Sequence, residues 1–155
     1  MNEFKLFNNQ LAGVIAAISP SGRRKLAAEI AKELRRSQQQ RIKQQKSPNG
    51  TPYQARKHQP LRAKSGRIKR AMFQKLRTSR YMKASGRYDA AVVEFTGKVQ
   101  RIARIHQLGL RDQPNSYAQD VQYPARQLLG FSDSEEVFVE KIIIEYLDRK
   151  RFYKL

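Results

Sequence analysis

Residues 19–44 read SPSGRRKLAAEIAKELRRSQQQRIKQ, and this stretch predicts one long amphipathic helix over about residues 20–44. Ser19 is suited to cap the helix, and the proline that follows fits its first turn. An apolar stripe runs along the first half at three- and four-residue spacing, at Leu26, Ala27, Ile30, Ala31 and Leu34. Beyond Leu34 the stripe is reduced to Ile42. The second half therefore has too little apolar surface to hold itself down, and we expect it to be solvated or covered by a partner.

A shorter amphipathic helix precedes this one, and a capped helix ends the chain. Residues 3–18 place apolar side chains at helical spacing, at Phe4, Phe7, Leu11, Val14, Ile15 and Ile18. Near the C-terminus, Ser132 and Glu135 have the spacing of a capping box. The helix that begins there has an apolar face, formed by Val137, Phe138, Ile143, Ile144, Tyr146 and Leu147. The tail, residues 148–155, ends in FYKL, and we expect these last residues to dock on the domain or on a neighbouring subunit.

The middle of the chain predicts a small antiparallel sheet. Residues 90–96 (AAVVEFT) form the clearest strand, and we expect a hairpin with a strand near residues 80–84, with Gly86 punctuating the connection. The other expected elements are short: a helix near residues 68–76, a helix over residues 98–107 and a strand around residues 121–123. The predicted fold class is therefore α+β, with N-terminal helices, a small antiparallel sheet and a C-terminal helix in one domain, residues 1–155.

Positive charge is concentrated in one part of the chain. The formal net charge is +19, and 18 lysines and arginines between Arg23 and Arg77 face only two carboxylates, Glu29 and Glu33. Within this part, residues 47–66 contain three prolines, two glycines and almost no apolar residues, which predicts a long, basic, flexible loop. Such a concentration of charge attracts polyanions and acidic protein surfaces.

Residues 103–132 (ARIHQLGLRDQPNSYAQDVQYPARQLLGFS) contain two corners that bracket a polar loop. The first corner is IHQLG at residues 105–109, and the second is PARQLLG at residues 124–130. Glycine and proline fix the direction of the backbone, so the corners predict a shaped and rigid surface feature. We expect His106 to have a structural role, with its side chain hydrogen-bonded to backbone near Gly109.

Arg126 has two readings. It is either an ordinary surface residue or a fixed guanidinium that clamps a carboxylate or a carbonyl, in the second case at a subunit boundary. The candidates for contacts between subunits are Arg126, Leu128, Leu129, His106 and Gly109.

Several classes of function lack support in the sequence. The chain has no cysteine, which excludes disulfides, thiolate catalysis and cysteine-based zinc sites. No apolar run approaches the roughly 20 residues of a membrane span, and the N-terminus lacks the layout of a secretory signal. A hydrolase would need His106, Asp112 and Asp120 in an arrangement that nothing in the sequence suggests. We therefore expect no enzyme activity, metal or cofactor, and a protein that folds in cytoplasm.

The order of four segments resembles the phage virion-morphogenesis family of contractile-tailed temperate phages. These segments are RRKLAAEIAKELRRSQQQRI, GRIKRAMFQKLRTSRYMKA, ARIHQLG and PARQLLGFS. The resemblance covers nearly the whole chain. It implies a structural component of the phage neck, made in the host cytoplasm, that finishes the tail and helps it join the DNA-filled head. Related neck and tail-terminator proteins are small α+β domains that assemble into rings, commonly six-fold.

This resemblance suggests two partners for the basic segment: double-stranded DNA passing through a ring, or an acidic surface on an adjacent neck ring. A solvated helix face and loop account for part of the charge, but two glutamates cannot neutralise 18 cations. Contacts with DNA would be directed at phosphates and independent of sequence. The candidate residues are Arg35, Arg36, Arg41, Lys43, Arg56, Lys57, Arg62, Lys64, Arg67, Lys69 and Arg70.

The sequence thus predicts a structural neck protein that forms an oligomeric ring at the head-proximal end of the tail. A hexamer is the candidate form of this ring. Its partners would be the tail tube and other neck or head-completion proteins. The alternative is a free basic module that binds DNA or RNA as a chaperone. That alternative explains the charge equally well, but it does not explain the two corners.

Overall fold

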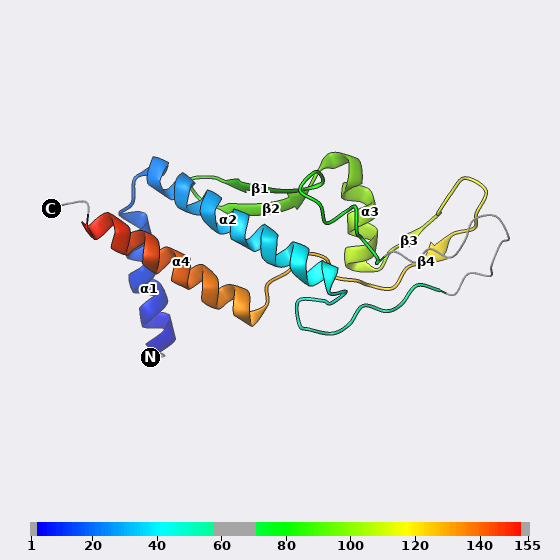
Figure 1. Ribbon diagram of the computed structural model, residues 1–155, viewed down its shortest axis with the longest axis horizontal. Coiled ribbons are helices and arrows are strands. Elements are labelled where there is room, and N and C mark those ends of the chain that lie inside the picture. Colours follow the sequence, from blue (N-terminus) through cyan, green and yellow to red (C-terminus); the bar gives the residue numbers. More distant parts are fainter. Residues whose placement is uncertain (1–2, 58–70, 153–155) are drawn as a thin grey trace.

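The computed structural model describes residues 3–57 and 71–152. The order of elements along the chain is shown in Figure 1. They are α1 (Glu3–Ala16), α2 (Pro20–Lys43), β1 (Met82–Gly86), β2 (Ala91–Phe95), α3 (Gly97–Leu108), β3 (Arg111–Asp112), β4 (Val121–Gln122) and α4 (Asp133–Phe152).

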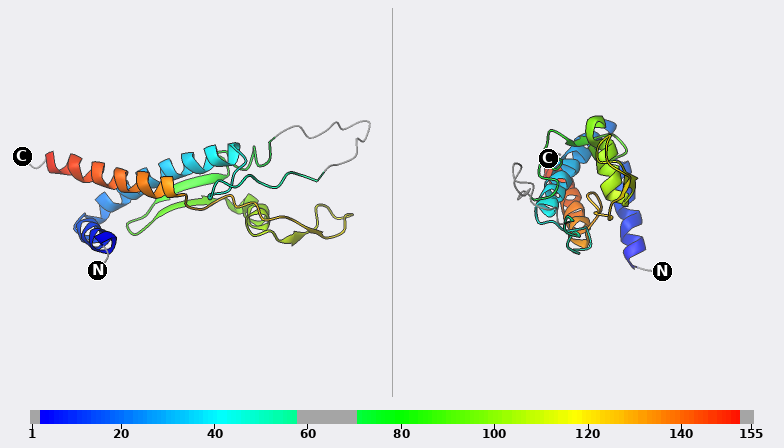
Figure 2. Two further views of the ribbon diagram at one scale, coloured as in Figure 1. Left: turned by 90° about the horizontal axis from the view of Figure 1, so that it is seen from below. Right: turned by 90° about the vertical axis from the view of Figure 1, so that its right-hand side faces the viewer.

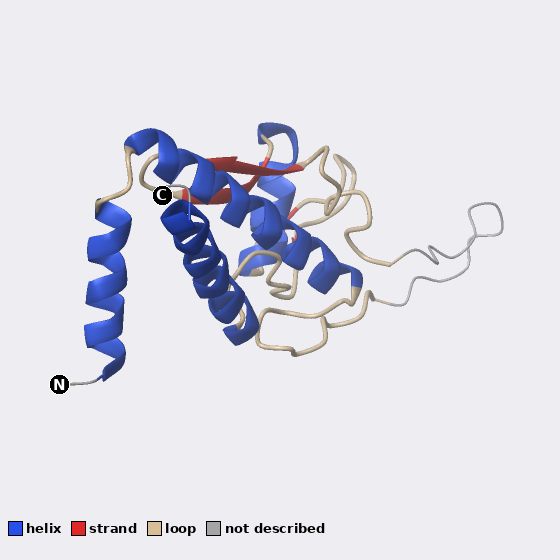
Figure 3. Ribbon diagram, turned by 60° about the vertical axis from the view of Figure 1, so that its left-hand side comes forward, coloured by secondary structure: helices blue, strands red, loops and turns tan. Residues whose placement is uncertain are grey.

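Helix α2 is the central element of the fold. It lies across the antiparallel hairpin of β1 and β2, in which Met82 pairs with Phe95 and Gly86 with Ala91. Helix α4 packs beside α2 (Figure 1), and the molecule is elongated, with the β3–β4 loop toward the end opposite the C-terminus (Figure 2). Helix α1 leads away from the rest of the fold (Figure 3). Among its described side chains, Ile15 packs against the core between α2 and α4.

Two hydrophobic clusters lie along α2. The first joins the N-terminal half of α2 to α4, through Leu26, Ile30, Leu34, Ile143 and Tyr146. The second lies under the C-terminal end of α2, and its buried members are Ile42, Tyr53, Leu76, Met82, Phe95, Ala103 and Leu128. The second cluster contains at least one residue from each of α2, β1, β2, α3 and the second corner. It therefore fixes the second corner relative to the helices and the hairpin.

Most of the predicted elements are confirmed. The long helix begins at Pro20 after Ser19, whose hydroxyl accepts a hydrogen bond from the backbone N–H of Gly22 at 3.1 Å. The capping box at α4 is present, since Ser132 N–H donates to Glu135 Oε2 at 3.0 Å and Glu135 N–H donates to Ser132 Oγ at 3.3 Å. The hairpin, α3 and β4 also lie where the sequence placed them, although β1 begins two residues later than expected.

The predicted helix near residues 68–76 is wrong over its described part. Residues 72–77 form consecutive turns instead. Phe73 has a φ of 65°, which a right-handed helix cannot accommodate. The backbone of Met72 is also taken by the side chain of Gln45, which donates to its carbonyl at 2.9 Å and accepts from its N–H at 3.0 Å.

Three other expectations need correction. Gly86 does not merely punctuate the hairpin; it ends β1 against α2, where an added Cβ would lie 2.2 Å from the backbone nitrogen of Ala28. On α4, Val137 and Ile144 are exposed, so the apolar face of that helix is narrower than predicted. In the basic loop, residues 47–51 form a hydrogen-bonded turn and Tyr53 is buried, so the first part of the loop is tied down. Residues 58–66 of that loop, and residues 153–155 of the C-terminal tail, lie outside the described residues.

Candidate functional site

The two corners predicted from the sequence lie directly against each other. Gly109 ends α3 in the left-handed conformation, with a φ of 64° and its N–H bonded to the carbonyl of Ile105. A Cβ at Gly109 would lie 2.7 Å from the backbone nitrogen of Ala125, and Arg126 N–H donates to the carbonyl of His106 at 2.7 Å. Glycine is needed here for both reasons, the positive φ and the close approach. We call this contact between residues 105–109 and 124–130 the corner junction.

Gln107 holds the corner junction together. Its Oε1 accepts hydrogen bonds from the backbone N–H groups of Leu128 and Leu129, at 2.8 and 2.9 Å. Its Nε2 donates to the carbonyl of Leu129 at 2.8 Å. One side chain thus satisfies three backbone groups of a segment that has no strand partner. This role of Gln107 could not be predicted from the sequence, because no spacing or motif distinguishes a single glutamine.

Arg126 is buried and clamps carbonyl groups of its own chain. Its Nε donates to the carbonyl of Gln54 at 2.8 Å, and one terminal nitrogen donates to the carbonyl of Ala55 at 3.2 Å. The hydroxyl of Tyr53 returns a bond to the carbonyl of Gln127 at 2.9 Å. Desolvation by burial, and then repulsion from Arg56, lower the pKa of Arg126. Arg126 therefore clamps carbonyl groups, as one of the two readings predicted, but they belong to its own chain and not to a neighbouring subunit, and the clamp ties the basic loop to the corner junction.

His106 lies in an aromatic cluster. Its ring stacks edge-on with Phe73, with centroids 4.9 Å apart, and with Tyr123 at 5.1 Å. The expected side-chain hydrogen bond is absent, since Nδ1 is buried and has no hydrogen-bond partner among the described residues. Burial, followed by the charge of Arg126, lowers the pKa of His106. The histidine is thus a neutral packing residue, and the group that bonds at the corner junction is its backbone carbonyl.

A buried polar network covers the C-terminal half of α2, where the apolar stripe of the sequence is reduced to Ile42. Glu135 accepts hydrogen bonds from the Ser37 hydroxyl at 2.6 Å and from Gln38 Nε2 at 3.0 Å. Arg41 donates to Gln38 Oε1 and to the carbonyl of Leu128 at 2.7 Å, and it lies 3.9 Å from Glu135. Desolvation lowers the pKa of Arg41, and the carboxylate of Glu135 opposes that shift. We call these four residues the Glu135 network. The partner that covers this end of α2 is the same chain.

The structure divides the sequence-predicted basic residues into three groups. Arg36, Lys43, Arg56 and Lys57 are exposed, whereas Arg35 is half-buried and Arg41 is buried. Arg62, Lys64, Arg67, Lys69 and Arg70 lie outside the described residues. Two further exposed residues, Lys25 and Lys32, were not among the predicted basic candidates, although helical spacing places them on the polar side of α2. With Arg36 and Lys43 they form one exposed line along α2, which we call the basic ridge.

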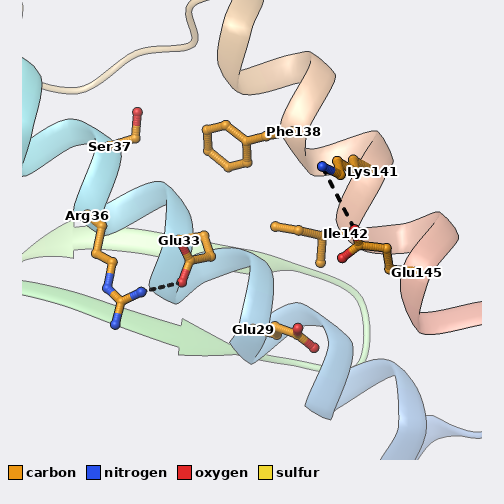
Figure 4. A pocket seen from close by; sticks show the side chains of 8 residues that line it. All are labelled: Glu29, Glu33, Arg36, Ser37, Phe138, Lys141, Ile142 and Glu145. Carbon is orange, nitrogen blue, oxygen red and sulfur yellow. Dashed lines mark hydrogen bonds and ion pairs between the residues drawn. The ribbon is translucent and has the colours of Figure 1, made fainter. Parts of the chain in front are cut away.

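A cleft of about 570 Å³ lies between α2 and α4 (Figure 4). Phe138 and Ile142 form its apolar part, and charged side chains surround them. Each of its glutamates already contacts a cation. The pairs are Glu33–Arg36 at 2.8 Å, Glu145–Lys141 at 4.0 Å and Glu29–Arg149 at 3.1 Å. The glutamates of this cleft therefore carry no unpaired negative charge, and the cleft is part of the contact between two packed helices.

Other classes of site find no support in the part of the chain that the structure describes. Within residues 3–57 and 71–152, no three His, Cys, Asp or Glu side chains are placed to hold a metal ion. None of the described helices combines the length and the apolar character needed to cross a membrane.

Comparison with known proteins identifies the family. Residues 3–148 match the Phage virion morphogenesis family. The chain belongs to this family. Tail completion protein S of Escherichia phage P2 is 48% identical over 150 residues, which cover 96% of this chain and 100% of that protein. No solved structure matches the chain.

Membership of the phage virion morphogenesis family confirms the resemblance seen in the sequence. It also places the chain with structural proteins of virion assembly and not with enzymes. The corner junction and the Glu135 network agree with that assignment, because their polar groups are used in holding segments of the chain together. Leu128 and Arg126 make their contacts inside the chain, so a role between subunits stays a prediction for the corner region as a whole.

Proposed function

We propose that this chain completes the phage tail at its head-proximal end and supports the joining of tail and head. The observation that carries the proposal is the 48% identity to tail completion protein S of phage P2, which extends over all of that relative. In this role residues 1–155 act as one domain, assembled in the host cytoplasm and located in the virion neck. The protein acts as a ring of identical subunits, with six as the expected number.

The described structure supports a role in assembly. The corner junction, the Arg126 clamp and the Glu135 network hold four segments in fixed relative positions. A protein that offers a surface for other proteins to dock on needs such fixed segments. Fixed segments bind without a large loss of conformational freedom. The tail tube and other neck or head-completion proteins are the expected neighbours of the ring.

Complementation tests this proposal. Extracts of cells infected with a phage that lacks functional tail completion protein S would receive the purified chain. We expect the number of infectious particles to rise and electron micrographs to show tails joined to heads. An Arg126→Gln variant should complement poorly, while an Arg87→Gln variant, altered at the exposed hairpin turn, should act as the wild type. A folded wild-type chain that neither binds tails nor restores joining would refute the proposal.

A free nucleic-acid-binding module is the second candidate, and the basic ridge favours it. The ridge runs from Lys25 to Lys43, about 27 Å at 1.5 Å per residue, and all four of its side chains are exposed. A gel-shift titration with salt separates the two candidates. Tight binding to free duplex by a chain that stays monomeric would favour the module. Assembly on tails with weak binding to free duplex would favour the neck protein.

A further inference from the structure

Helices α3 and α4 each present exposed apolar side chains that nothing among the described residues covers. On α4, Val137 is 66% exposed and Ile144 is 44% exposed. On α3, Ile102 is 50% exposed and Leu108 is 55% exposed. Val137 and Ile144 are seven residues apart, so they lie on the same side of α4. Ile102 and Leu108 are six residues apart and lie on different sides of α3, whereas Leu108 shares its side with Arg104. Exposed apolar residues gathered on one face of a helix are a common mark of a protein–protein contact.

The charges around the two apolar pairs are opposite in sign. Four carboxylates flank the exposed side of α4, and none forms an ion pair with a described cation: Asp133, Glu136, Glu140 and Asp148. Every charged residue of α3 is basic, at Lys98, Arg101 and Arg104. Arg101 contacts Asp112, whereas Lys98 and Arg104 have no ion-pair partner among the described residues. Lys141 also lies beside Val137 and Ile144, but it is paired with Glu145, so the exposed side of α4 is acidic and apolar on balance and that of α3 is basic and apolar.

The two surfaces do not meet within one chain, because α4 packs against α2 while α3 packs against β2, and the two helices lie apart (Figure 1). They can meet between two copies. A contact between different surfaces of identical subunits continues from one copy to the next and closes into a ring when the rotation permits. The dimensions also match: α3 has 12 residues and is about 18 Å long, while the exposed side of α4 from Asp133 to Asp148 extends about 22 Å.

We propose that the exposed side of α4 in one subunit binds the exposed side of α3 in the next. Val137 and Ile144 of one copy pack against Leu108 of its neighbour. Glu140 and the other free carboxylates of α4 face Arg104, which lies one turn before Leu108 on the same side of α3, and this contact removes unpaired charge from both helices. This inference rests on the proposed function in one respect, namely that the protein acts as an oligomer, and it adds which surfaces form the contact.

Charge reversal tests the contact in the full-length chain, with oligomeric state measured by sedimentation velocity and multi-angle light scattering. We expect Glu140→Lys alone, and Arg104→Glu alone, to shift the wild-type oligomer toward monomer by at least tenfold in dissociation constant. The double variant, Glu140→Lys with Arg104→Glu, should assemble again, because the two charges are exchanged. Its recovery also shows that neither substitution prevents folding.

The matched control replaces the α3 change by one on the basic ridge. Glu140→Lys with Lys32→Glu has the same net charge as the restoring pair, and it should remain dissociated. Recovery in this control would show that only overall charge matters and would overturn the pairing of α4 with α3. Single variants that assemble like the wild type would also overturn the pairing, while leaving the proposed ring intact. A wild-type chain that is monomeric at every concentration would remove the ring itself, and the contact with it.

Discussion

At the scale of single residues, Gln107 is the group on which the corner junction depends. Three backbone groups of Leu128 and Leu129 have this side chain as their hydrogen-bond partner. The backbone of the second corner is therefore held by hydrogen bonds to one side chain, whereas the backbone of a strand is held by hydrogen bonds to the neighbouring strand. Buried backbone groups that lose their partner cost free energy, so the junction should be sensitive to this one position.

We expect Gln107→Leu to lower the free energy of unfolding by about 2–4 kcal/mol, because two N–H groups are left without an acceptor. Urea denaturation followed by circular dichroism measures the change. The control is Gln100→Leu, which alters an exposed glutamine on the same helix and should change stability by less than about 0.5 kcal/mol. Equal losses in the two variants would show that Gln107 does not secure the junction.

His106 predicts a dependence of stability on pH. Its pKa is lowered from 6.5 in the folded state, first by burial and then by the charge of Arg126. The unfolded chain therefore binds the proton more readily, and the free energy of unfolding should fall as the pH is lowered below about 6.5. Above that range this contribution is constant. The measurement is urea denaturation at pH 7.5 and pH 5.5 for the wild type and for His106→Leu.

The His106→Leu variant should lose less stability between these two pH values than the wild type. Other groups, such as carboxylates, titrate in both proteins and cancel in the comparison. The absolute stability of the variant is not the test, since leucine also changes the packing against Phe73 and Tyr123. An identical pH dependence in the two proteins would contradict a neutral, buried histidine.

At the scale of the elements, the hairpin and α2 approach each other through Gly86. A Cβ at this position would lie 2.2 Å from the nitrogen of Ala28 and 2.5 Å from the carbonyl oxygen of Arg24. These are backbone atoms, which cannot move away by changing rotamer as a side chain can, so Gly86→Ala must push the hairpin away from the helix. We expect a loss of about 1–3 kcal/mol, as for other overpacked sites. Thermal unfolding of the variant measures it.

The matched control is Gly97→Ala at the start of α3, where an added Cβ has nothing within 4 Å. Because alanine favours helices, this change should be neutral or stabilising by up to about 1 kcal/mol. If both alanine variants unfold at the same temperature, then the close approach of β1 to α2 does not limit the packing.

The elements that the sequence predicted correctly are those with a strong local signal. The stripe of α2, the capping box of α4 and the AVV run of β2 each depend on residues that are close together in the chain. The errors arise where distant residues decide. Glu135 covers the C-terminal end of α2 and bonds to Gln38, which lies 97 positions earlier in the chain. No periodicity in the sequence indicates such a pair. Phe73 adopts a positive φ in a segment whose apolar spacing is helical.

The same distinction applies to the candidate site. The glycine and proline corners were recognisable because those residue types constrain the backbone wherever they occur. That Arg126 clamps a carbonyl was one of two readings of the sequence, but the loop that supplies the carbonyls, Gln54 and Ala55, could not be identified. Lys25 and Lys32 entered the basic ridge only once the polar side of α2 was known.

At the scale of the whole molecule, the distribution of charge separates two kinds of contact. Four carboxylates without an ion pair lie on α4, and the basic ridge lies along α2, where Lys25, Lys32 and Lys43 form no ion pair with a described residue. A duplex of DNA would be repelled by the first surface and attracted by the second. If DNA passes through the assembled ring, the basic ridge is therefore the surface that we expect to face it.

Binding of duplex DNA should accordingly be independent of sequence and strongly dependent on salt. Replacing both Lys32 and Lys43 by glutamine should reduce the slope of log K against log salt concentration by about 1.8, because each phosphate contact contributes about 0.9. Fluorescence anisotropy with two unrelated duplexes, each at several salt concentrations, measures the slope. The control replaces Lys83 and Lys141, exposed lysines of β1 and α4, and should leave it unchanged. Equal slopes for all three proteins would mean that the ridge does not contact phosphates, and the acidic surface of a neighbouring ring would then be the better partner for it.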